Sequence, residues 1–188
     1  MLKAEIAILE LLKGAKTQKE IAQRLGISLS TVNNAMEPLE RIGAIEKKKF
    51  GLKLSDKEKA LTYWASIRNL QKDIIYATRS GLPVGKIEKN MPSGIAFTAY
   101  TAFRLRHAQV PADYSEVYVY AEHGELEEIE KRFPLQKGPP NILVLKKEKH
   151  MDWQIAPDEL VFVDLWNLKE WYAKEFLRAL RQKMGLET

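Results

Sequence analysis

Short polar side chains that could contact nucleic-acid bases gather near the middle of the segment Thr17–Leu54. The group consists of Ser30, Thr31, Asn33 and Asn34. An asparagine amide can both donate to and accept from an adenine edge, and a serine or threonine hydroxyl bonds to several partners. The polar group therefore predicts hydrogen bonding to base edges, provided that one helix presents these residues together.

Lysines follow within the same segment. Four of them lie close together, namely Lys47, Lys48, Lys49 and Lys53, and no acidic residue occurs from 47 to 53. Residues 44–50 and 52–54 are expected to pair as a hairpin around Gly51. Lysines at a hairpin tip are suited to contact phosphates, and three or four such contacts would make binding steeply salt-dependent.

Helical periodicity and capping signals predict the elements that carry these side chains. Apolar residues predict a first helix over residues 2–13. Thr17 and Glu20 form the spacing of a capping box, which begins a second helix, and Gly26 supplies the turn after it. Ser28 is the expected N-cap of a third helix.

The third helix should divide its faces between the core and solvent. Val32, Met36 and Leu39 recur at spacings of four and three, so they are expected to face the core. The polar group is then left on the other faces. The full set of candidate DNA-contacting residues is Thr17, Lys19, Ser28, Ser30, Thr31, Asn33, Asn34, Lys47, Lys48, Lys49 and Lys53.

The run IAQRLGISLSTVNNAMEPLERIGAIEKKK resembles winged helix-turn-helix transcription regulators. The matching positions are Ile21, Ala22, Leu25, Gly26, Ser28, Thr31, Val32, Leu39, Gly43 and Ile45. The resemblance covers about the first 55 residues. It implies a fold in which the helix holding residues 30–34 enters the major groove of double-stranded DNA while the wing touches the backbone.

A long connecting helix is expected over residues 56–79. Ser55 and Glu58 have capping-box spacing, and apolar residues follow on more than one face. Such a helix would be buried between two domains or against a second subunit, which makes a homodimer one alternative. Gly81 and Pro83 end it. The expected domains are therefore a DNA-binding domain (1–55), a connecting helix (56–81) and an α/β domain (82–188).

The C-terminal domain is expected to contain a small mixed sheet covered by helices, which makes the whole chain α+β. Strands are predicted at 117–121, 141–146 and 160–164. Helices are predicted at 93–106 and 124–133, with a last one from Asn167, capped with Glu170, to Met184.

Catalytic patterns are missing from this half. No pair of carboxylates lies in a predicted strand, Asp164 stands alone at a strand end, and the three histidines are scattered. The glutamates of 125–130 are expected on a solvated helix face. We therefore expect no enzymatic activity, no metal and no cofactor.

A further resemblance spans nearly the whole chain. The segments PSGIAFTAYTAFRL and LVFVDLWNLKEWYAKEFLRAL are similar to AbiEi-type antitoxin regulators, which join a winged helix to a nucleotidyltransferase-like domain without catalytic residues. Members of that family repress their own operons, and some neutralise a partner toxin. The resemblance implies a possible toxin-like protein partner.

Composition limits the remaining possibilities. The net charge is +5, of which +4 lies in residues 1–60, so the basic excess coincides with the candidate DNA-contacting residues. The absence of cysteine excludes disulfides, and abundant Lys and Glu are typical of a thermophile. No apolar run reaches a membrane span, and the N-terminus resembles a helix rather than a signal peptide, so a cytoplasmic location is expected.

The leading interpretation is a sequence-specific DNA-binding transcriptional regulator, either a repressor or an antitoxin-like autoregulator. The alternative is a protein-interaction module, an antitoxin or a replication-associated adaptor, whose helix-turn-helix is mainly a scaffold.

Overall fold

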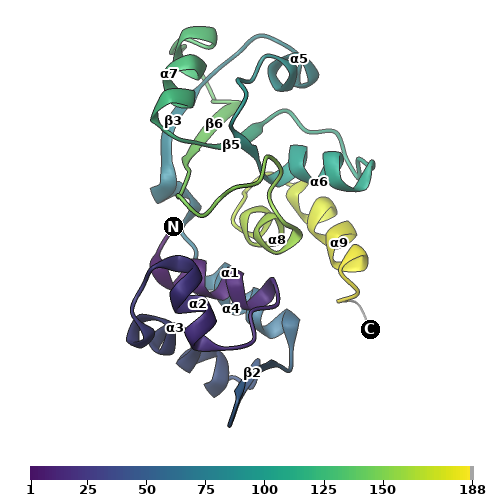
Figure 1. Cartoon of the computed structure of the whole chain (residues 1–188). Coiled ribbons are helices and arrows are strands. Elements are labelled where there is room, and N and C mark those ends of the chain that lie inside the picture. Colours follow the sequence, from purple (N-terminus) through teal and green to yellow (C-terminus); the bar gives the residue numbers. More distant parts are fainter. Residues whose placement is uncertain (187–188) are drawn as a thin grey trace. The chain divides into compact units, whose positions relative to one another are not determined.

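The computed structural model describes residues 1–186, which divide into two compact units, 1–68 and 69–185. Figure 1 shows the helices and strands of each unit. In the described part of the chain, no helix combines the length and the apolarity that crossing a membrane requires.

The N-terminal unit is a helical bundle with a hairpin. It contains α1 (Lys3–Leu12), α2 (Gln18–Leu25), α3 (Leu29–Arg41), β1 (Ile45–Lys48), β2 (Gly51–Leu54) and α4 (Lys57–Ile67). Helices α1, α2 and α3 pack against one another, and α4 packs on α1 and α3. The predicted first three helices and the hairpin are confirmed.

Local signals explain where these helices begin and end. Thr17 Oγ1 accepts the Glu20 amide at 3.0 Å, and Gly26 has a φ of +62° at the end of α2. Left-handed backbone of this kind favours glycine because it has no Cβ. Asp56, not Ser55, caps α4, since its carboxylate accepts the Lys59 amide at 2.9 Å, whereas Ser55 donates to Glu46.

A buried ion pair joins the first and last helices of this unit. The carboxylate of Glu5 accepts hydrogen bonds from Trp64 Nε1 at 3.1 Å and from Arg68 Nη1 at 3.2 Å. The side chains of Glu5 and Arg68 are 3% and 0% exposed. A charge removed from water in this way depends on its partner, so the pair links α1 to the end of α4.

The prediction of a long connecting helix over residues 56–79 is wrong in its second half. Helix α4 ends at Ile67, a 3₁₀ turn covers Leu70–Asp73, and Ile74–Thr78 is strand β3. The reason is long-range pairing: this β-branched and aromatic segment forms the antiparallel edge next to β6. Periodicity within 56–79 could not show a partner strand whose paired residues lie 64 to 71 positions further along the chain.

The C-terminal unit is built on a four-stranded mixed sheet in the order β3-β6-β5-β4. The other strands are β4 (Ala96–Phe97), β5 (Val117–Ala121) and β6 (Ile142–Lys146), and β5 runs parallel to β6. The helices are α5 (Val84–Lys89), α6 (Ala99–His107), α7 (His123–Arg132), α8 (Asp158–Trp166) and α9 (Ala173–Lys183). The predicted strands at 117–121 and 141–146 and the helix at 124–133 are confirmed.

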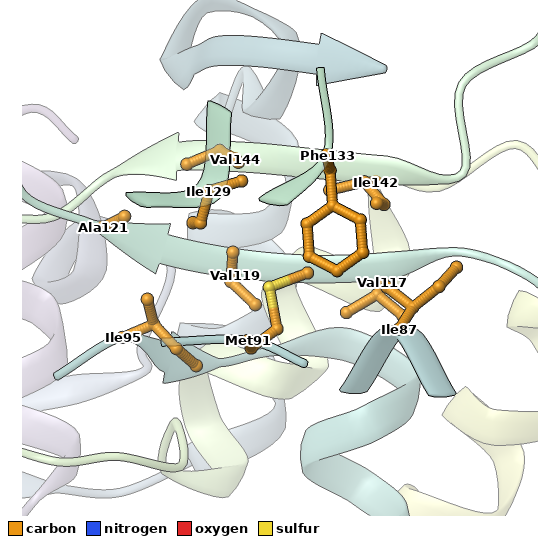
Figure 2. Close-up of a cluster of buried hydrophobic side chains, with 10 residues drawn as sticks. All are labelled: Ile87, Met91, Ile95, Val117, Val119, Ala121, Ile129, Phe133, Ile142 and Val144. Atoms are coloured by element: carbon orange, nitrogen blue, oxygen red, sulfur yellow. The ribbon is translucent and has the colours of Figure 1, made fainter. Parts of the chain in front are cut away.

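Helices cover both faces of this sheet. Val117 and Val119 point to one face, where they pack with Ile87 of α5 and Ile129 of α7 (Figure 2). The alternate residues point to the other face: the ring of Tyr118 contacts Tyr100 of α6, and Tyr120 bonds to α8. The period of two along β5 thus places the strand between two helical layers.

Three further predictions in this unit are wrong. Residues 160–164 are predicted to form a strand but lie in helix α8. The run is apolar and buried on every side, so its sequence has neither a helical nor a strand period. Residues 93–98 precede α6, since Ala96–Phe97 pairs with β5. Asn167 ends α8 instead of capping the last helix, which begins at Ala173.

Candidate nucleic-acid interface

Helix α3 divides its faces as the sequence predicts. Val32, Met36 and Leu39 are fully buried, and their spacing places them on the bundle side. The opposite face exposes Ser30, Asn33 and Asn34. The helix therefore carries a row of short polar side chains into solvent.

Some of these polar groups already have partners. Ser28 Oγ accepts the Thr31 amide at 3.1 Å, and both the Ser30 and Thr31 hydroxyls lie within 3.0 Å of it. Asn33 accepts from Gln18 Nε2 at 3.3 Å, which links α3 to α2. The side chain of Asn34 makes no hydrogen bond to residues 1–186, so its amide has both its donors and its acceptor available for a base edge.

The wing is a short hairpin attached to the start of α2. Strands β1 and β2 pair in the register Lys48↔Gly51, so Lys49 and Phe50 form the connection. The Leu52 amide donates to the Lys16 carbonyl at 2.6 Å. A Cβ on Gly51 would lie 2.4 Å from that same carbonyl oxygen, so the close approach requires glycine.

A notch of about 280 Å³ separates the wing from the helices, and it brings several predicted residues together. Thr17 and Lys19 line it from α2, and Lys47 and Lys48 line it from the wing. Thr17 already uses its hydroxyl as the α2 cap, which makes it a structural residue first. Lys19 is exposed beside the wing lysines and extends their positive charge.

Three of the wing lysines have acidic partners in the folded unit, one from α3 and one from the wing itself. Lys47 Nζ lies 2.7 Å from Glu40 of α3, and Lys53 Nζ lies 3.8 Å from Glu46, which also pairs with Lys48. The hydrogen bond from Lys48 is the main cause that lowers the pKa of Glu46. Water screens exposed pairs of this kind, so a phosphate can replace the glutamate.

The tip of the wing carries a residue that the sequence analysis did not single out. Phe50 is 85% exposed, and the Lys49 ammonium lies 5.3 Å from the centre of its ring. Leu29, at the start of α3, is 53% exposed and lines the same notch. An aromatic residue within the connection of a lysine-rich hairpin is the sequence signal for this feature.

Polar groups of the C-terminal unit are arranged differently. Asp164 is not at a strand end but inside α8, where it is fully buried. Its Oδ2 accepts from Thr98 at 2.7 Å and from Tyr120 at 2.8 Å. A carboxylate held in this way is a structural hydrogen-bond acceptor, because neither solvent nor a solute reaches it.

A protein-family model matches the chain at its N-terminal end. Residues 1–46 match a family model described as winged helix-turn-helix DNA-binding. Neither the curated proteins nor the solved structures contain a match to the chain. The exposed face of α3, the wing beside it and this match together identify the N-terminal unit as a winged helix-turn-helix DNA-binding domain.

Proposed function

We propose that the protein is a sequence-specific regulator of transcription that binds double-stranded DNA, acting either as a repressor or as an antitoxin-like autoregulator. The observation that carries this proposal is the exposed polar face of α3 beside a lysine-rich wing. A helix of this kind fits the major groove, and the wing lies along the phosphate backbone.

The two parts of the interface have different tasks in this proposal. Ser30, Asn33 and Asn34 read base edges, and Asn34 contributes most because its amide is unengaged. Lys19, Lys47, Lys48, Lys49 and Lys53 contact phosphates. Ser28, Thr31 and Thr17 hold α3 and α2 in place through their hydroxyls and add contacts to the nearest phosphates.

The test begins with selection of bound duplexes from a random library, which supplies a binding sequence. Binding is then measured against salt concentration for the wild type and for K47E/K48E/K49E/K53E. Each lost phosphate contact should reduce the slope of log K against log salt by about 0.9, so the variant should bind every duplex more weakly and with a flatter slope.

A matched control reverses four exposed lysines of the C-terminal unit: K86E/K131E/K149E/K174E. This control has the same net charge as the wing variant but should keep the salt slope of the wild type. Equal slopes for the wild type and the wing variant would show that the wing does not contact phosphates.

The ion pairs of the wing give some weight to the alternative, a protein-interaction module. Lys47, Lys48 and Lys53 already face glutamates, and an acidic protein surface could replace those glutamates as well as DNA could. Purification from the native cell separates the alternatives. A stoichiometric protein partner, such as a toxin, without any retained DNA would favour the interaction module.

For the C-terminal unit we propose a non-catalytic, nucleotidyltransferase-like role in regulation or partner binding. The support is the sequence resemblance. Its second segment is predicted to contain a strand at 160–164, but these residues are helical, so the resemblance there is of sequence alone. Incubation with labelled nucleoside triphosphates and Mg²⁺ should give no labelled product, and labelling would make the protein an enzyme.

We also propose a homodimer on DNA, because helix-turn-helix proteins often bind two half-sites related by symmetry. Analytical ultracentrifugation with the selected duplex tests this point. A single protein copy on DNA at saturation would contradict it.

A further inference from the structure

A concavity of the C-terminal unit lies beside α5 and α6 and has a volume of about 620 Å³. Its walls are apolar where Val84, Phe97, Leu105 and Val110 line it. Leu105 and Val110 are 41% and 49% exposed, so the rim presents uncovered apolar surface. This size and mixed character are typical of a site for a small organic molecule.

Four polar side chains form a connected network at one wall. Glu88 Oε1 accepts from Thr101 at 2.8 Å and from Tyr114 at 2.8 Å, while Oε2 accepts from Arg104 Nη2 at 2.7 Å. Arg104 Nε donates to the Tyr114 hydroxyl at 2.9 Å. Arg104 is therefore held on two sides, so its guanidinium group has a fixed orientation.

The network has N–H groups that are not hydrogen-bonded, whereas its carboxylate oxygens already accept hydrogen bonds. The side chain of Glu88 is only 9% exposed, and its carboxylate already accepts three hydrogen bonds. Arg104 remains 35% exposed, and its Nη1 makes no hydrogen bond to the described residues. A guanidinium group has five N–H donors, so a ligand meets a positive, donor-rich group fixed next to apolar walls.

We propose that this pocket binds a small amphipathic monocarboxylate, whose carboxylate bonds to Arg104 Nη1 and whose apolar body lies against Phe97, Leu105 and Val110. Arginine favours carboxylates because its planar N–H groups match their geometry. A cationic ligand would have to displace Arg104, Thr101 or Tyr114 from Glu88. The other two charged residues of the lining, Lys89 and Asp113, carry opposite charges and so favour neither sign of ligand. The site is independent of DNA binding, so it can be tested without knowing the regulated sequence.

The test uses 4-phenylbutyrate as the probe with the full-length, ¹⁵N-labelled protein. Amide chemical shifts are followed in titrations with the acid, with neutral 4-phenylbutanamide and with cationic 4-phenylbutylamine. We expect saturable shifts within residues 84–114 for the acid and at least tenfold weaker binding for both analogues. R104Q should weaken binding of the acid at least tenfold.

Two further variants separate a ligand contact from a folding effect. V110D changes only an exposed rim residue and should exclude the apolar body while leaving the rest of the spectrum unchanged. R178Q removes an exposed arginine of α9 that pairs with Glu175 and should bind like the wild type. Three results would overturn the proposal: no saturable shifts in 84–114, equal binding of acid and amide, or tighter binding of the amine.

Discussion

Polar side chains face outward in the functional part of the N-terminal unit, whereas the C-terminal unit turns its polar side chains inward. Ser30, Asn33 and Asn34 are exposed on α3. Asp164 is fully buried, and the hydroxyls of Thr98 and Tyr120 donate to it. The first arrangement suits a surface that meets a large polar partner. The second one suits a scaffold whose hydrogen bonds are satisfied internally.

The N-terminal unit contains one exception, the buried Glu5–Arg68 pair, and its removal should have the largest effect. Glu5→Ala removes the buried carboxylate that accepts from Trp64 and Arg68, and breaking this buried pair should destabilise the unit by about 3–5 kcal/mol. Hydrogen–deuterium exchange should then lose protection in residues 1–68 but keep it in 69–185.

The matched variant for this measurement is Glu37→Ala, which removes an exposed carboxylate from α3 of the same unit. It should stay within about 0.5 kcal/mol of the wild type. If Glu5→Ala behaved like Glu37→Ala, the pair would not stabilise the unit. Loss of protection in both units would show that they do not unfold independently.

The position of the wing is the next feature to test. Gly51→Ala places a Cβ 2.4 Å from the Lys16 carbonyl oxygen, so the hairpin must shift, at a cost of about 1–3 kcal/mol. Affinity should fall for all duplexes alike. Anisotropy titrations with selected and random duplexes measure this affinity. The control is Gly85→Ala in α5, where an added Cβ has no atom within 4 Å. Unchanged affinity would mean that the wing position does not matter.

Sequence reasoning succeeded where the deciding interactions are local. Caps at Thr17 and Ser28, the left-handed Gly26 and the buried spacing of Val32 and Met36 all lie within a few residues of their partners. It failed at β3 and α8. The strand depends on pairing with β6, and the helix is apolar on every side, so neither has a local signature.

The candidate interface shows the same division. The exposed face of α3 follows from helical spacing, which the sequence displays directly. The ion pairing of the wing lysines does not follow from the sequence, because Glu40 of α3 reaches Lys47 only after the chain folds. The pocket beside α5 and α6 was missed for this reason too: Glu88, Arg104 and Tyr114 are separated by up to 26 residues and come together only in the folded unit.

A smaller and more selective effect is expected at the exposed face of α3. Asn34→Ala should lose about 1–3 kcal/mol at one base pair and little on other sequences. Asn33→Ala should instead weaken binding to all sequences slightly, since Asn33 also bonds to Gln18. Repeating the selection with each variant gives the base preferences. Identical preferences for Asn34→Ala and the wild type would exclude Asn34 as a base-reading residue.

The smallest effect concerns the inward-facing tyrosines of the C-terminal unit. Burial, followed by the hydrogen bond to Glu88, raises the pKa of Tyr114 to about 12, above the ordinary 10.0. The unfolded chain therefore ionises first. The stabilisation is complete below pH 10 and is lost as the pH rises from 10 to 12. Because Tyr114 is only partly buried, the loss should be a modest fall in Tm across that range.

Thermal unfolding of Tyr114→Phe and Thr101→Val at pH 8 and pH 11 isolates this effect. Both variants remove one hydrogen bond to Glu88, which costs about 1 kcal/mol at pH 8, and Tyr114→Phe also removes the hydrogen bond that Arg104 Nε donates, which costs about 1 kcal/mol more. Only Tyr114→Phe also removes the ionisable hydroxyl, so its Tm should fall less between the two pH values than that of Thr101→Val. Equal falls would mean that the inward-facing hydroxyl of Tyr114 contributes packing and hydrogen bonding alone, without coupling the C-terminal unit to pH.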